Sequence, residues 1–140
     1  MKTTPADAVD KPFSWPVRVY YEDTDAGGVV YYANYLRFLE RARTEWLRAA
    51  GVDQARLREE QGIIFVVADV QVEYLQPARL DDMLEVTVEI ARSGRASLNF
   101  GQQVHRGDAT LCRATVRAGC VGADDFRPRR LPQSLRGMLG

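Results

Sequence analysis

The stretch YEDTDAGGVVYYANYLRFLERARTEW, residues 21–46, decides how this chain folds. Its first part, residues 22–28, is polar, carries two aspartates and ends in two glycines. Paired glycines favour backbone angles that other residues avoid, so a strand cannot continue through this part and a loop is predicted. From Tyr32 onward the spacing of the apolar residues changes to that of a helix.

One long helix is predicted between Tyr32 and Gly51. Apolar side chains recur there at steps of three and four residues, which places them on one face, and arginines occupy the opposite face. Gly51 is a suitable C-terminal stop. A second, shorter helix is expected at residues 52–61, closed by Gly62. The apolar positions of the long helix are Tyr35, Leu36, Leu39, Ala42, Trp46, Leu47 and Ala50.

The remaining segments have the pattern of antiparallel strands. One strand is expected before the loop, at residues 15–21, and four more follow Gly62 with apolar and polar residues in alternation. Glycines at Ser93-Gly94-Arg95 and Arg106-Gly107-Asp108 predict hairpin turns. This order predicts an α+β fold, an antiparallel sheet curled around one long helix, with uncovered surface that favours a dimer or larger assembly. The four later strands are expected at 68–74, 84–90, 98–104 and 112–120.

Size and composition indicate one globular domain. The 140 residues are 46% hydrophobic and 27% charged, an ordinary composition for a soluble protein. The 19 basic and 19 acidic side chains cancel, so no general attraction to nucleic acid or to an anionic membrane is expected. The longest apolar run, residues 63–68, is too short to span a bilayer. We expect the domain at 15–123, between a flexible leader at 1–14 and a surface tail at 124–140.

The two cysteines, Cys112 and Cys120, indicate a reducing compartment. If they share one strand, eight residues separate them by ~26 Å, much more than a disulfide spans. Both are therefore expected to be small core residues. Because the first dozen residues also lack the apolar core of a signal peptide, a cytoplasmic location is expected.

The loop and the helix start together form a candidate site for acyl transfer. The first N–H groups of a helix have no internal partner and lie at the positive end of the helix dipole, where they can hold an oxyanion or a phosphate. Asp25 places a carboxylate beside them. One group can attack or activate water while the other stabilises the charge of a tetrahedral intermediate.

Residues 20–43, YYEDTDAGGVVYYANYLRFLERAR, resemble the 4-hydroxybenzoyl-CoA thioesterase family, and most of all its bacterial branch associated with the Tol–Pal envelope system. The resemblance rests on the pattern Asp-x-x-Gly-x-Val-x-x-x-x-Tyr, which starts at Asp25 and leads into a helix. It is strong over residues 17–47 and continues as strand order over 63–122. It implies a hotdog fold, with active sites at the interface of a homodimer that is often part of a homotetramer.

The resemblance also implies roles for individual residues. Asp25 would act as nucleophile or general base, and the backbone N–H of Tyr32 would polarise the thioester carbonyl. Gly28 and Val29 would contact the substrate. No metal or redox cofactor is implied, since coenzyme A is part of the substrate. Contacts to the CoA phosphates are implied for the turn that contains Arg92, Ser93 and Arg95.

Several residues allow other interpretations. Asp23 and Asp25 could cap the helix, or hold a metal if a third ligand existed; Asp23 is taken as structural. A catalytic pairing of the lone histidine, His105, with an aspartate is conceivable, but an exposed polar role is preferred, and a single histidine argues against a Ser–His–Asp hydrolase or a multi-histidine zinc site. Another branch of hotdog thioesterases uses a glutamate on the central helix, which draws attention to Glu40 and Glu45.

The function predicted on these grounds is hydrolysis of an acyl-CoA thioester to a free acid and CoA. A hotdog hydratase is the rival within enzymes, although it would want a helix-borne Asp–His pair that this sequence does not show. A non-catalytic alternative is a domain that binds acyl-CoA or a partner in envelope or lipid synthesis. Release of free thiol from CoA esters would separate these possibilities.

Overall fold

The computed structural model describes residues 12–139, so most of the expected leader at 1–14 lies outside the described residues. The first strand, β1, spans Phe13–Arg18, and a short 3-10 turn follows at Tyr21–Asp23. The strand therefore begins two residues before, and ends three residues before, the predicted range of 15–21. Strand pairing ends at Arg18, which lies opposite Met83, the first residue of the next strand in the sheet.

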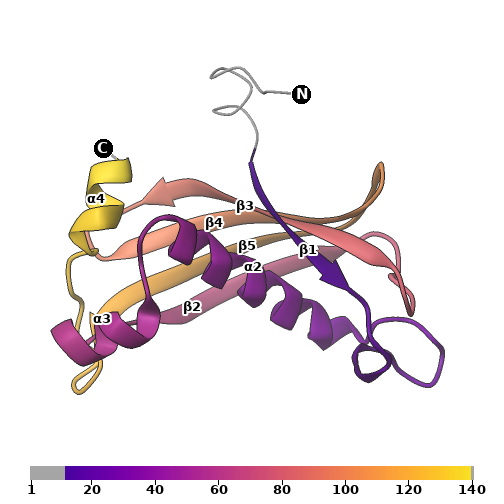
Figure 1. Ribbon diagram of the computed structural model, residues 1–140, viewed down its shortest axis with the longest axis horizontal. Helices are drawn as coiled ribbons and strands as arrows, with labels where there is room; N and C mark the ends of the chain where they lie inside the picture. Colours follow the sequence, from indigo (N-terminus) through magenta and orange to yellow (C-terminus); the bar gives the residue numbers. More distant parts are fainter. Residues whose placement is uncertain (1–11, 140) are drawn as a thin grey trace.

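Five antiparallel strands form one sheet, in the order β1-β3-β4-β5-β2 (Figure 1). Four of them follow the helices, as the alternating pattern predicts. The hairpin turns fall where glycines were expected: Gly94 donates its N–H to Ser97 O at 2.9 Å, and Gly107 has a φ of 58°. The later strands are β2 (Ile63–Tyr74), β3 (Met83–Ser93), β4 (Ser97–Arg106) and β5 (Ala109–Gly122).

The long helix α2, Tyr35–Ala49, lies along one face of this sheet (Figure 1). Its buried residues recur at the predicted spacing, and Trp46 packs edge-on against Phe100 of β4 with ring centroids 5.7 Å apart. Each large apolar side chain buried in this way contributes roughly 1.5–3 kcal/mol. One expected position is wrong, because Leu36 is exposed. The buried residues of α2 are Tyr35, Phe38, Leu39, Ala42, Trp46 and Leu47.

The start of the helix differs from the prediction. Residues Tyr32–Asn34 form a 3-10 turn, and the α-helix begins only at Tyr35. The N–H of Asn34 donates to Tyr31 O at 2.8 Å, a three-residue step that tightens the chain before the α-helix begins. The shorter helix α3, Gln54–Gln61, is closed by Gly62 in the left-handed conformation, as expected.

The strand β2 contains an irregularity that the alternating pattern did not reveal. The register with β5 shifts between Val67 and Asp69, which leaves Ala68 as an extra residue. Val67 before the bulge and Val70 after it lie opposite Ala118 and Val116, two residues of the hydrophobic core. The unbroken strand ladder expected through residues 68–74 is therefore interrupted at Ala68.

The C-terminal segment is not the surface tail that was expected at 124–140. It ends in the helix α4, Gln133–Leu139, and both Leu131 and Leu135 belong to the main core. The N–H of Leu131 also donates to Arg95 O at 2.9 Å, which attaches this segment to the β3–β4 turn. Sequence reasoning missed this because prolines and arginines dominate the composition of the segment.

Both cysteines are free and buried on β5, as predicted. Burial raises the pKa of each thiol to about 11. No helix within residues 12–139 has the length and apolar character needed to cross a membrane.

Candidate active site

The loop that carries Asp25, residues 24–30, is called the aspartate loop and is a small hairpin closed by backbone hydrogen bonds. Asp25 donates its N–H to Val29 O at 2.9 Å, and Gly28 donates to Asp25 O at 3.0 Å. Thr24 and Val30 form an antiparallel bridge just below this turn. Gly28 has a φ of 80°, a conformation that glycine adopts without strain, so the tight turn depends on a glycine at this position.

The carboxylate of Asp25 is held by its own turn. Its Oδ1 accepts a hydrogen bond from Gly27 N–H at 2.8 Å, and no hydrogen bond to Oδ2 is recorded among the described residues. A Cβ at position 27 would lie 3.2 Å from Oδ1, so a larger residue there would crowd the carboxylate. One oxygen is thus oriented while the other remains available on an exposed surface.

The N–H of Tyr32 is a free donor of fixed direction. Within residues 12–139 it has no hydrogen-bond acceptor, because the 3-10 turn begins at this residue. The same peptide unit includes Tyr31 O, which accepts from Asn34 N–H at 2.8 Å. In a planar trans peptide the N–H is directed opposite to the C=O, so the bond from Asn34 also sets the direction of the Tyr32 donor. Tyr32 O in turn accepts from the hydroxyl of Tyr74 at 2.8 Å.

The two halves of the site belong to one hairpin. Tyr31 N–H donates to Asp23 O at 3.1 Å, directly before the bridge of Thr24 with Val30. The structure therefore brings together four of the predicted site residues, Asp25, Gly28, Val29 and Tyr32. A carboxylate and an unpaired, oriented N–H on one rigid hairpin can attack, or deliver water to, a carbonyl and hold the resulting oxyanion.

The base of this hairpin is fixed by Asp82. Its carbonyl accepts from Val19 N–H at 2.9 Å, and its carboxylate accepts from Arg79 N–H and from the Arg106 guanidinium, both at 2.8 Å. Partial burial alone would raise the pKa of Asp82, but these hydrogen bonds and charges outweigh it and lower the pKa. A short bridge between Val29 and Arg79 connects this support to the loop.

An aromatic hollow of about 270 Å³ lies beside the Tyr32 donor. The hydroxyl of Tyr35 accepts from Ala78 N–H at 2.9 Å, and burial raises the pKa of both Tyr35 and Tyr74, so both remain neutral at ordinary pH. A larger hollow, about 560 Å³, lies on the outer face of the sheet, away from the loop. The aromatic hollow is lined by Val30, Tyr32, Tyr35, Tyr74, Leu75, Gln76 and Pro77.

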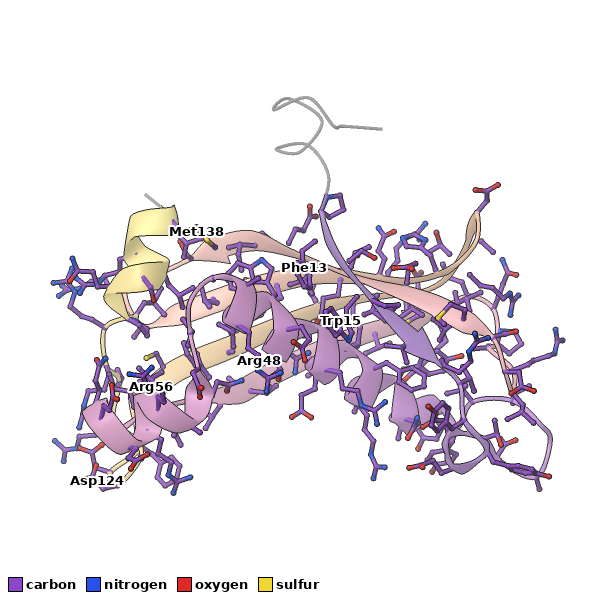
Figure 2. The ribbon with its side chains drawn as sticks, in the orientation of Figure 1. Phe13, Trp15, Arg48, Arg56, Asp124 and Met138 are labelled. Atoms are coloured by element: carbon purple, nitrogen blue, oxygen red, sulfur yellow. The ribbon has the colours of Figure 1, made fainter. Side chains whose placement is uncertain are left out.

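The structure does not bring Arg92, Ser93 and Arg95 to this site within one chain. The aspartate loop adjoins the start of β3, whereas these residues lie at or just beyond the end of that 11-residue strand. A strand of that length spans about 35 Å. The two places are at opposite ends of the molecule in Figure 1, and Arg56, Asp124 and Met138 mark the arginine end in Figure 2.

Sequence reasoning missed two groups of residues. Leu131 pairs with Arg95, which brings the arginine-rich segment 127–130 to the β3–β4 turn; the four-residue spacing of Leu131 and Leu135 was the available signal. Asn34 connects both halves of the aspartate hairpin, but in the sequence it is one polar residue within a helical pattern.

The other candidates have different surroundings. Neither Asp23 nor Asp25 caps α2, since no side chain caps that helix. His105 lies on the sheet face opposite α2, with Nδ1 3.3 Å from the Thr110 hydroxyl. Glu45 pairs with Arg48 at 2.6 Å, and Glu40 is exposed. Residues 12–139 contain no cluster of three or more His, Cys, Asp or Glu side chains arranged for a metal ion.

A family model and two curated relatives agree on the family to which this chain is similar. Residues 27–113 match the family model described as the thioesterase superfamily. The acyl-CoA thioesterase YbgC of Haemophilus influenzae is 46% identical over 128 residues, which cover 91% of this chain and 94% of that protein. The acyl-CoA thioester hydrolase YbgC of Escherichia coli O6:H1 is 52% identical over 124 residues, which cover 88% and 92%.

Solved structures agree with this result. The crystal structure of a probable thioesterase from Bartonella henselae superimposes with a TM-score of 0.83 at 34% identity, covering 87% of this chain and all of that one. The arrangement of one sheet around one long helix is thus the hotdog arrangement expected from the sequence.

Proposed function

We propose that this chain, which belongs to the thioesterase superfamily and hydrolyses acyl-CoA thioesters, uses the carboxylate of Asp25 and the backbone N–H of Tyr32 for that reaction. The observation that supports these roles is the hairpin itself. It orients one carboxylate oxygen through Gly27 N–H and leaves the Tyr32 N–H without a recorded partner in the described part of the chain.

In this mechanism the thioester carbonyl oxygen accepts a hydrogen bond from Tyr32 N–H. The free oxygen of Asp25 then either attacks the carbonyl carbon or removes a proton from the water that attacks it. The charge that develops on the carbonyl oxygen is stabilised by a donor that needs no rearrangement. If Asp25 attacks, the carbon–sulfur bond breaks, CoA leaves as the thiolate, and water then hydrolyses the acyl anhydride formed with Asp25. If Asp25 activates water, the water oxygen adds to the carbonyl carbon, the carbon–sulfur bond breaks, and the proton taken up by Asp25 passes to the leaving thiolate. Gly28 and Val29 line the approach to the carbonyl, and no cofactor takes part.

The neutral tyrosines beside Tyr32 fit the acyl group better than the nucleotide. Their hollow is mostly apolar at its wall and carries no charged residue. The nucleotide end of CoA carries phosphates, for which Arg92 and Arg95 are suitable partners. In one chain these arginines are about 35 Å from the aspartate loop, so we infer that a second subunit supplies them.

The two edge strands support a homodimer formed through β2. β1 is a six-residue edge that contains Pro16, whereas β2 offers twelve residues without proline. Val67, Val70 and Tyr74 on β2 are 49%, 38% and 45% exposed, an apolar surface that pairing would cover. A two-fold axis makes the paired strands antiparallel, so the arginine end of one subunit comes beside the partner's Asp25. A homotetramer would be a dimer of such dimers.

We also infer a cytoplasmic location and an association with the Tol–Pal envelope system. The two free, buried cysteines agree with a reducing compartment, and the association rests on the resemblance of residues 20–43 to that branch of the family. Cell fractionation with antibody detection tests the location. Recovery of the chain only from the periplasm contradicts it.

The test of the catalytic assignment is Asp25→Asn, assayed by release of free thiol from a panel of CoA esters. If the carboxylate is a general base, kcat falls by ~10²–10⁴ while the protein remains folded. Glu22→Gln, which removes an exposed carboxylate three residues away, serves as the control and keeps its activity. Near-normal turnover by purified, folded Asp25→Asn would contradict the catalytic role of the Asp25 carboxylate.

A further inference from the structure

The buried carboxylate of Asp23, next to the aspartate loop, has no ion-pair partner among residues 12–139. Asp23 is 4% exposed, and Asn34 beside it is 8% exposed. A buried carboxylate is costly unless hydrogen bonds replace the water it loses. Here Oδ2 accepts from Tyr20 N–H at 2.8 Å and Oδ1 accepts from the Asn34 side-chain amide at 2.9 Å.

Asn34 occupies a position where asparagine ordinarily caps a helix, yet it does not do so. It directly precedes α2, and no side-chain capping bond is present there. Its amide instead reaches back 11 residues along the chain to Asp23. The Asn34 side chain therefore binds Asp23 instead of capping the helix, as asparagine commonly does at this position.

The contact joins the two functional halves through their backbones. Asn34 N–H fixes Tyr31 O and so the direction of the Tyr32 donor, while the Asn34 side chain holds Asp23, two residues before Asp25. Asp23 O also accepts from Tyr31 N–H at 3.1 Å. Movement of the Asp23–Asn34 pair would therefore displace the carboxylate and the donor relative to each other.

We propose that Asp23 and Asn34 are positioning residues that hold the Asp25 carboxylate and the Tyr32 N–H in register, a role that rests on the proposed functions of Asp25 and Tyr32. Neither side chain needs to touch the substrate. Because misplacement of reacting groups by about 1 Å can cost on the order of 100-fold in rate, loss of the pair lowers kcat. Substrate binding depends on other surfaces, so KM changes little.

The geometry permits a reciprocal exchange as a test. In Asp23→Asn the Asn34 amide can turn so that its oxygen accepts from the new amide, which leaves a neutral hydrogen bond in place of the charge-assisted one. In Asn34→Asp two carboxylates oppose each other. In the double variant, an amide at position 23 can accept from Tyr20 N–H through oxygen and donate to a carboxylate at position 34, so both hydrogen bonds are restored in reverse.

The experiment measures kcat, KM and melting temperature for Asp23→Asn, Asn34→Asp, Asn34→Ala and the double exchange, well below each melting temperature. Asn34→Asp and Asn34→Ala are each expected to lose 10- to 100-fold in kcat with less than a threefold change in KM, and Asp23→Asn, which keeps a neutral hydrogen bond, is expected to lose less. The double exchange is expected to recover to within about fivefold of the parent, an interaction that independent sites do not show. Val116→Ala, which shortens a side chain buried in the core, is the stability control: its melting temperature falls and its kcat does not.

Asn34→Asp and Asn34→Ala variants that lower only the melting temperature, as Val116→Ala does, overturn the proposal. So does a folded double exchange that is no more active than Asn34→Asp. If Asn34→Ala does not fold, Asn34→Ser takes its place in the same comparison. If the proposed role of Asp25 is itself wrong, the result is different: Asp25→Asn then retains turnover, whatever the variants of Asp23 and Asn34 do.

Discussion

The aspartate end and the arginine end of the molecule are built in opposite ways. At the aspartate end, a network of short backbone hydrogen bonds fixes a neutral donor and a single carboxylate. At the arginine end, the β3–β4 turn carries exposed Arg92 and Arg95, which form no ion pair within residues 12–139. Bond rearrangement needs groups placed to a fraction of an ångström, whereas attraction of phosphates needs mainly charge. We therefore expect changes at the first end to affect kcat and changes at the second to affect KM.

The largest effect within this contrast is expected from Gly27→Val. A side chain at this position crowds Asp25 Oδ1, which a Cβ would approach to 3.2 Å, and so displaces the carboxylate. Steady-state kinetics should show kcat reduced by about 100-fold with KM nearly unchanged. Gly137→Val is the matched control, since nothing lies within 4 Å of a Cβ there. An effect of Gly27→Val on KM alone would contradict the contrast.

The next effect concerns the arginine end. Truncation of Arg92 and Arg95 to alanine should raise KM for CoA esters by about 10-fold, since each exposed charge contributes on the order of 1 kcal/mol or less. Esters of pantetheine, which lack the nucleotide phosphates, should show no such increase. The double change Arg113→Ala, Arg117→Ala on the outer face of β5 removes the same charge elsewhere and serves as control. An equal rise for both kinds of ester would remove the phosphate role.

Mixing variants tests whether the two ends cooperate across subunits. Asp25→Asn and the Arg92/Arg95 double variant are each impaired, but in a mixed dimer one composite site carries both changes and the other carries neither. Random reassociation should restore about a quarter of the parental activity at low substrate concentration. If both ends served the same chain, no site free of changes would form and activity would stay at the average of the two variants.

The smallest effect is expected from a change at Asp82, which supports the base of the aspartate hairpin, and it concerns the free energy of unfolding. The lowered pKa of Asp82 means that its charged form stabilises the folded state above the unfolded pKa of about 3.9, and that this contribution is lost as the pH falls through the lower folded pKa. Asp82→Asn should lower the free energy of unfolding by about 1 kcal/mol at pH 7 and by less near pH 3. Urea unfolding at the two pH values measures this, and an equal loss at both would contradict the role of the charge.

Much of the fold was predictable because its signals are local. The three- and four-residue spacing of Leu39, Ala42 and Trp46 follows from the geometry of a single helix. The hairpin glycines at positions 94 and 107 were predicted from turn chemistry within a few residues. The bulge at Ala68 was not, since alternation looks unbroken until a partner strand sets the register.

The candidate site likewise has one part that the sequence could predict and one part that it could not. Asp25, the two glycines and Tyr32 are contiguous enough for the sequence alone to point to a carboxylate beside free N–H groups. Asn34 could not be assigned a role, because its partner Asp23 lies 11 residues away and only the folded hairpin joins them.

By itself, the sequence determined the chemical groups and the local turns, because side-chain identity and backbone preference act over a few residues. Only the tertiary structure decided which groups share a site. It showed that a strand of about 35 Å separates the aspartate loop from Arg92 and Arg95, and that Leu131 anchors the C-terminal segment beside them. Those relations depend on strand register and core packing, which join residues far apart in the chain.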